Sequence, residues 1–147
     1  MPNPRALLAV LAVSAFGALA SHVAAAERAA PPAGAELYFI APMNGAQLTS
    51  PVRVQFGLRG MGVAPAGVEM PDTGHHHLLV NADPLPDLAQ PLPSSDSVRH
   101  FGKGQTETEL ELAPGTYTLQ LVLGDARHVP FDPPLMSGTI TITVLPD

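Results

Sequence analysis

The chain has 147 residues, of which 46% are hydrophobic and 14% are charged, and its lack of cysteine excludes disulfides and thiol nucleophiles. This length suits one ordinary domain and argues against two. The formal net charge of −6 at pH 7 argues against a nucleic-acid partner, because surfaces that bind phosphates carry excess positive charge.

The first 26 residues have the pattern of a secretory signal peptide. Arg5 precedes an apolar run from Ala6 to Ala20, and three consecutive alanines close the segment. An apolar run of about 15 residues is shorter than the roughly 20 that span a bilayer as a helix. We therefore predict removal of residues 1–26 and export of the protein to the periplasm or the medium. An uncleaved N-terminal anchor is the alternative.

The rest of the chain is predicted to be one β-domain that is not embedded in a membrane. Residues 27–36, rich in alanine and proline, form a predicted flexible lead-in to a domain at residues 37–147. Apolar and polar residues alternate with a period of two, and no long apolar pattern has helical spacing. Six strands are predicted, at residues 37–40, 52–58, 75–80, 106–112, 116–123 and 139–144. A further strand within the proline-rich residues 83–93 would bring the number to seven.

These strands fit an immunoglobulin-like antiparallel β-sandwich of six or seven strands, with a small barrel as the alternative. Tyr117 favours the sandwich, because such folds carry a tyrosine at a strand start whose hydroxyl bonds back to the preceding corner. An ordinary core tyrosine is the other interpretation. The predicted core contains Val54, Phe56, Leu110, Leu112, Leu119, Leu121, Ile140 and Ile142.

Histidine is the most conspicuous residue type in the domain. Five histidines follow the predicted signal peptide, namely His75, His76, His77, His100 and His128. Successive antiparallel strands reverse direction, so the connections that carry these histidines are expected at one end of the sandwich. On a strand, His75 and His77 share one face with their Cα atoms about 7 Å apart, and His76 faces the other way. We therefore expect the imidazoles to converge at this rim.

Imidazole is a good ligand for zinc and copper ions. We predict a copper or zinc site whose ligands are His75, His77, His100 and His128. The predicted supporting residues are His76, Lys103, Gln105, Asp125 and Asp132. Asp125 has two possible roles in this hypothesis, since its carboxylate can fix the tautomer of an imidazole or cap a turn.

Two other functions stay open beside the metal-binding module. Histidines together with Lys103 could bind a small anionic ligand. Alternatively, the protein could be a structural or accessory envelope domain that meets a protein partner and whose histidines only order the loops. An enzyme is less favoured, because the sequence has no cysteine and no serine in a nucleophile elbow.

Three segments of the chain also resemble a known family. They are Gly74-His75-His76-His77-Leu78-Leu79, the stretch from His100 to Thr108 (HFGKGQTET), and Leu123-Gly124-Asp125 followed by His128, Pro130 and Asp132. In these motifs, over about residues 60–144, the chain is similar to the bacterial family labelled domain of unknown function 4399. The resemblance implies an exported β-domain and brings no established activity with it.

Overall fold

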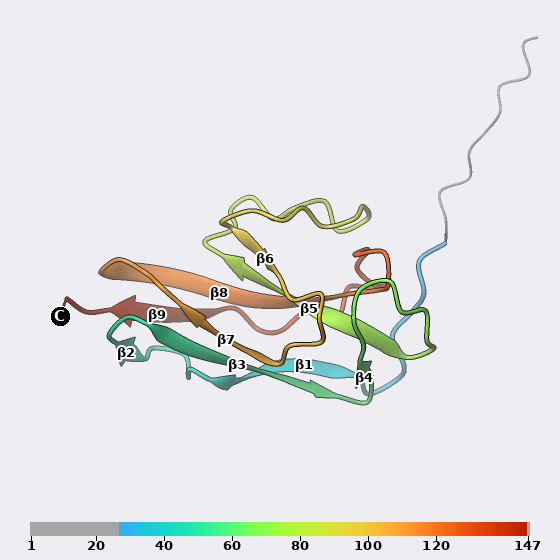
Figure 1. Cartoon of the computed structure of the whole chain (residues 1–147), viewed down its shortest axis with the longest axis horizontal. Helices are drawn as coiled ribbons and strands as arrows, with labels where there is room; N and C mark the ends of the chain where they lie inside the picture. The colour runs from blue at the N-terminus through green and yellow to red at the C-terminus, as the bar shows by residue number, and fades with distance from the viewer. Residues whose placement is uncertain (1–26, 147) are drawn as a thin grey trace, which may run out of the picture.

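The computed structural model describes residues 27–146 (Figure 1), and the predicted signal peptide lies outside them. Within these residues the chain forms nine strands and no helix. The strands are β1 (Glu36–Ala41), β2 (Gln47–Leu48), β3 (Val52–Arg59), β4 (Gly62–Val63), β5 (Thr73–Val80), β6 (Val98–His100), β7 (Glu107–Leu110), β8 (Gly115–Gly124) and β9 (Ile140–Val144). The described part of the chain accordingly offers no helix that could cross a membrane.

The strands form two sheets that pack face to face. The smaller sheet has the order β1-β3-β7, and its strands are antiparallel. The larger sheet has the order β2-β9-β8-β5-β4, and β6 also pairs with β5. Figure 1 shows β1 and β3 as one layer and β8 and β9 as the other. The predicted β-sandwich is therefore confirmed over the barrel, while its immunoglobulin-like character stays a prediction.

The six predicted strands all occur, but the seventh was misplaced. Residues 83–93 contain no strand, and the additional elements are the short strands β2, β4 and β6. Four prolines lie in residues 83–93, and proline has no N–H to donate to a neighbouring strand. The first regular pairing after this segment is β6, whose residues pair with His77, Leu78 and Leu79 of β5.

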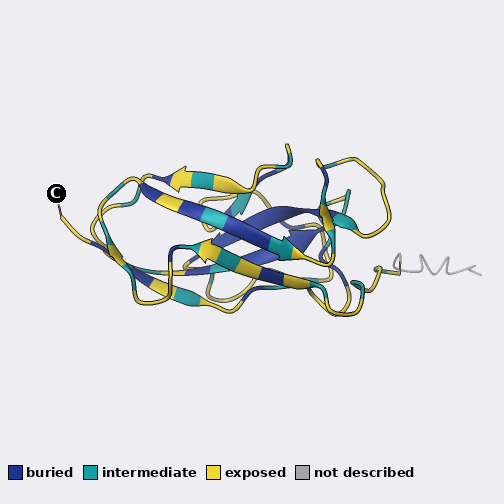
Figure 2. Cartoon of the chain, turned by 90° about the horizontal axis from the view of Figure 1, so that it is seen from below, coloured by how far each residue is buried: buried dark blue, intermediate teal, exposed yellow. Residues whose placement is uncertain are grey.

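The main core lies between the two sheets and follows the alternation of the strands. Val54, Leu119, Leu121 and Ile142 are completely buried in it. Figure 2 shows buried residues in dark blue along the strands. Of the predicted core residues, Leu112 and Ile140 are only half-buried and pack against the cluster. Leu112 lies beyond the end of β7 at Leu110, and Ile140 is the first residue of β9.

A second, smaller apolar cluster covers the outer face of the larger sheet. It contains Leu79 of β5, Val122 of β8, Val98 of β6 and Leu92 from the preceding loop. The loop is attached to the sheet by the bond from the Val80 amide to the Ser97 carbonyl, at 2.9 Å. Figure 1 shows β6 and this loop lying over β5 and β8. The outer face of β5 is therefore covered rather than exposed to solvent.

Two local predictions can be compared with this fold. The hydroxyl of Tyr117 donates to the carbonyl of Ala113 at 2.9 Å, which confirms the bond back to the corner.

In the lead-in, the Arg28 guanidinium donates to the Leu88 carbonyl at 2.8 Å and pairs with Asp132 at 3.0 Å. Arg28 thus ties residues 27–35 to the domain, and the predicted flexibility of the lead-in stays a prediction.

Candidate metal centre

Strand β5 carries three consecutive histidines, and its alternation divides them between two faces. His75 lies opposite Gly124 of β8, and His77 lies opposite both Val122 of β8 and His100 of β6. The side chains of His75 and His77 share the outer face of the sheet, and His76 points between the sheets. All three residues are 0% exposed, whereas His100 and His128, which complete the predicted centre, are partly exposed.

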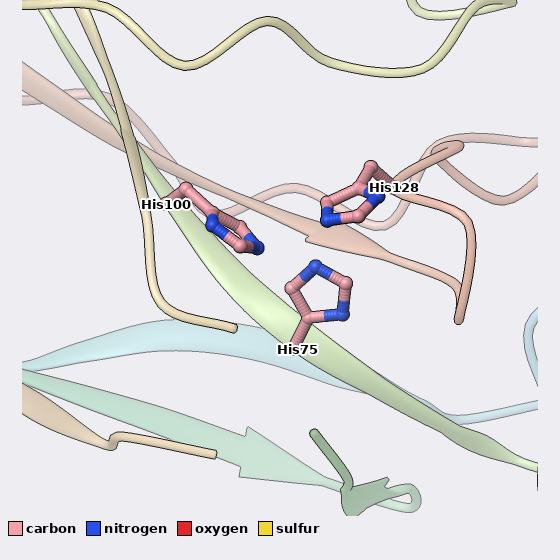
Figure 3. Close-up of side chains that lie close together, drawn as sticks. All are labelled: His75, His100 and His128. Atoms are coloured by element: carbon pink, nitrogen blue, oxygen red, sulfur yellow. The ribbon is translucent and has the colours of Figure 1, made fainter. Parts of the chain in front are cut away.

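Three imidazoles from three separate segments meet on the outer face. His75 comes from β5, His100 ends β6, and His128 lies in the turn that follows β8. Their ring centroids form a nearly equilateral triangle, with separations of 5.1 Å for His75 and His100, 5.0 Å for His75 and His128, and 4.7 Å for His100 and His128. One ring nitrogen from each residue lies within 4.8 Å of the other two. Figure 3 shows the three rings facing one another, and we call them the outer trio.

His77, the fourth predicted ligand, lies beside the outer trio. Its ring centroid is 4.7 Å from that of His75, 5.2 Å from that of His100 and 6.0 Å from that of His128. Its ring nitrogens do not belong to the group that approaches within 4.8 Å. The structure therefore assembles all four predicted rings, with three in ligand-like proximity and His77 adjacent.

His76 occupies a different environment on the inner face. Its ring centroid is 5.1 Å from that of Phe56, which in turn lies 4.9 Å from Phe101. Burial lowers the pKa of His76 to about 4, against a smaller opposing effect of the Gln105 backbone. His76 is a core side chain and does not contribute to the outer trio.

The buried imidazoles lack hydrogen-bond partners within the described protein. Both ring nitrogens of His75, His76 and His77, and Nε2 of His100, are buried without one. A buried polar atom without a partner destabilises a fold by about 1 to 3 kcal/mol, and native structures contain few of them. The outer-face nitrogens are therefore free to bind a ligand.

The local electrostatics favour the neutral form of three of these imidazoles, in which one ring nitrogen of each is free of a proton. Burial, followed by the charges of His128 and His100, lowers the pKa of His75 to about 4, with partial opposition from the Asp125 carboxylate. Burial and the neighbouring imidazoles lower the pKa of His77 to about 3. The pKa of His100 is also lowered, by burial and then by His128. Neutral imidazole is the form that binds metal, so the site does not have to release protons first.

Asp125 shapes the turn that presents His128. Its Oδ1 accepts hydrogen bonds from the amides of Arg127 at 2.8 Å and Val129 at 2.9 Å, and its Oδ2 lies 3.5 Å from the Arg127 guanidinium. His128 adopts a φ of 70° in this turn, which is uncommon for a non-glycine residue. These bonds confirm the turn-capping role of Asp125, and its tautomer-fixing role stays a prediction.

The other predicted supporting residues lie in contacts away from the outer trio. Lys103 and Gln105 are exposed, and the Lys103 amide donates to Gln105 Oε1 at 2.8 Å within their own turn. Asp132 is exposed and pairs with Arg28 at 3.0 Å. We expected these residues beside the histidines. In the structure, Lys103 bonds to Gln105 within one turn, and Asp132 pairs with Arg28 of the lead-in.

Two glycines that were not predicted as site residues make room for the rings. A Cβ on Gly102 would overlap the His100 ring, and a Cβ on Gly124 would lie 2.7 Å from Cε1 of His77. Such contacts are too short for any larger residue to occupy without displacing a ring. The sequence could have indicated both glycines. Gly102 stands two residues after His100, and Gly124 directly follows the predicted strand at residues 116–123.

Comparison with known proteins agrees with the sequence motifs. The family model described as domain of unknown function (DUF4399) matches residues 54–145. This range contains every histidine of the centre and strands β5 to β9. No curated protein and no solved structure matches the chain. The chain therefore belongs to the DUF4399 family.

Proposed function

We propose that this protein is an exported module that binds one transition-metal ion, copper or zinc, through His75, His100 and His128. The observation that carries the proposal is the approach of three ring nitrogens, from three separate segments, to within 4.8 Å of one another. Nitrogens around an ion at about 2.0 to 2.1 Å lie about 3 to 4 Å apart, so a small adjustment of the rings would complete the site. His77 is the adjacent imidazole and a candidate fourth ligand.

A purely structural role for the cluster is less consistent with the contacts. Histidines that only order loops are expected to bond to backbone groups, whereas His75 and His77 have no partner for either ring nitrogen. A binder of a small anion would need a nearby cation, and Lys103 is exposed in a turn of its own. Neutral imidazoles without a cation favour a metal ion over an anion.

Metal titration tests the proposal. Protein purified without a His-tag or chelator is titrated with Cu²⁺, with Zn²⁺ and, in the absence of oxygen, with Cu(I) at pH 7, next to His100→Ala. Asp132→Asn is the matched control, because Asp132 is exposed and bonded to Arg28 rather than to the cluster. We expect one ion to bind at micromolar affinity or tighter, and the control should bind it equally well. His100→Ala should lower the metal affinity by more than about 100-fold, which exceeds the usual effect of losing a residue that only supports a ligand. Equal, weak binding by all three proteins would eliminate the proposal.

Export is a separate part of the proposal and has its own test. The support is the Arg5 and apolar pattern of residues 1–26. N-terminal sequencing of protein recovered outside the cytoplasm should begin close to Glu27. A sequence that begins at Met1 would reject the cleaved signal peptide without affecting the metal site.

A further inference from the structure

We infer that the ion preferred by the outer trio is monovalent copper, Cu(I), rather than Cu²⁺ or Zn²⁺. This inference rests on the proposed function, since it identifies the ion that the same site takes. Three properties of the site favour this ion, namely the charge of the ligands, their surroundings and their arrangement.

The donor set carries no negative charge. The group of approaching side chains consists of His75, His100 and His128 and contains no carboxylate, and the chain has no cysteine that could supply a thiolate. With neutral imidazoles alone, the ion keeps its full charge after binding. The cost of moving an ion out of water grows with the square of its charge, so it is about fourfold larger for a divalent than for a monovalent ion of similar size.

The β5 side of the site is shielded from water, although His100 and His128 are partly exposed. His75 and His77 are 0% exposed, and His77 pairs with Val122, which belongs to the outer apolar cluster. Leu92 of the same cluster donates its amide to the carbonyl of His128 at 2.9 Å, which joins the cover directly to the site. Water is thus replaced by hydrocarbon on the side of the loop, where charge is poorly screened.

The Asp125 carboxylate, whose charge acts on His75, offsets only part of the charge of a bound ion. Asp125 stands three residues before His128, and its Oδ1 already accepts from two backbone amides at 2.8 and 2.9 Å. Its Oδ2 faces the Arg127 guanidinium at 3.5 Å, so the pair is close to neutral. A divalent ion would retain most of its charge.

The arrangement of the rings agrees with a low coordination number. The three centroids are separated by 4.7 to 5.1 Å, which presents a trigonal set of nitrogens. A zinc ion held by three histidines takes a water as its fourth ligand, because His77 stands outside the close group. Copper accepts imidazole ligands, and Cu(I) can stay three-coordinate in such a set without an added water.

The test compares affinities for three ions in the untagged protein at pH 7. Cu(I) affinity is measured without oxygen by competition with the coloured chelator bicinchoninate, and Cu²⁺ and Zn²⁺ affinities are measured by competition calorimetry. We expect Cu(I) to bind at least about 100-fold more tightly than either divalent ion, where each factor of ten corresponds to about 1.4 kcal/mol. If a divalent ion binds as tightly as Cu(I) or more tightly, and this binding requires His100, the inference is overturned while the proposed function stands. Failure of all three ions to bind would reject the proposed function itself.

A charge variant tests the cause of the preference. His77→Glu places a carboxylate beside the outer trio, and His77→Gln is the neutral control of the same length. We expect the ratio of Cu(I) to Zn²⁺ affinity to fall at least about tenfold in His77→Glu relative to His77→Gln. The same ratio in both variants would show that ligand charge does not cause the preference. If His77→Glu does not fold, the three affinities of the wild-type protein decide whether Cu(I) is preferred.

Discussion

The two faces of strand β5 bury the same residue type in contrasting surroundings. On the inner face, His76 packs against Phe56 between the sheets. On the outer face, His75 and His77 pack against His100 and His128 beneath a loop. All three β5 histidines are equally buried and lack hydrogen-bond partners. The difference teaches that a buried, unpartnered imidazole does not by itself indicate a metal site, whereas convergence of imidazoles from separate segments does.

Removal of the outer histidines should have the largest effect on this comparison. The double variant His75→Ala, His77→Ala should bind Cu²⁺ and Zn²⁺ at least about 1000-fold more weakly than wild type, because one ligand of the trio and its neighbour are lost. His76→Phe should keep wild-type affinity, since it changes only the inner face. Calorimetry of both variants, with circular dichroism to verify folding, measures this contrast. Comparable losses in both variants would contradict the assignment of the faces.

Truncation of the neighbouring leucines compares the packing of the same two faces. Leu78→Ala on the inner face should lower the free energy of unfolding by about 2 to 5 kcal/mol, because it opens a cavity in the main core. Leu79→Ala should cost less, at about 1 to 2 kcal/mol, because the loop that carries Leu92 can settle into the space. Urea denaturation measures both values. A larger cost for Leu79→Ala would show that the outer cover is the more rigid layer.

Acid should destabilise the fold through the buried histidines, and His76→Phe isolates the inner contribution. The pKa of His76 is lowered to about 4, so the unfolded chain binds more protons below its ordinary pKa of about 6.5. Stability is therefore complete above about pH 6.5 and is lost as the pH falls toward 4. Between pH 7 and pH 4.5, His76→Phe should lose about 2 to 3 kcal/mol less than wild type. Urea denaturation at the two pH values provides the measurement, and equal losses in both proteins would reject the role of His76.

Gly102→Ala should have the smallest effect, and it acts only on the outer face. The new Cβ would overlap the His100 ring and displace it from the trio without removing a ligand. We expect metal affinity to fall about tenfold, as for other changes that misplace a ligand. The same titration detects this change, with Gly138→Ala as control because a Cβ there meets no atom within 4 Å. Unchanged affinity in Gly102→Ala would show that His100 tolerates displacement.

Periodicity was sufficient to predict the strands and the division of the histidines. Alternation separates His76 from His75 and His77, and the reversal of successive strands explains why His100 and His128 reach β5. The burial of His75 and His77 could not be predicted in this way, because the irregular loop before β6 packs on the sheet through Leu92 and Val98 without any repeating pattern. The sequence left two roles open for Asp125, since the distances from its carboxylate to the backbone amides are defined only in the folded turn.

The most direct test of the contrast between the two faces is nitrogen NMR of the imidazole rings during titration with Cu(I) or Zn²⁺, both of which are diamagnetic. At one equivalent of the ion that binds, ring nitrogens of His75, His100 and His128 should shift, and those of His76 should stay unchanged. Absence of shifts in the outer trio at saturating ion, or an equal shift in His76, would contradict the account.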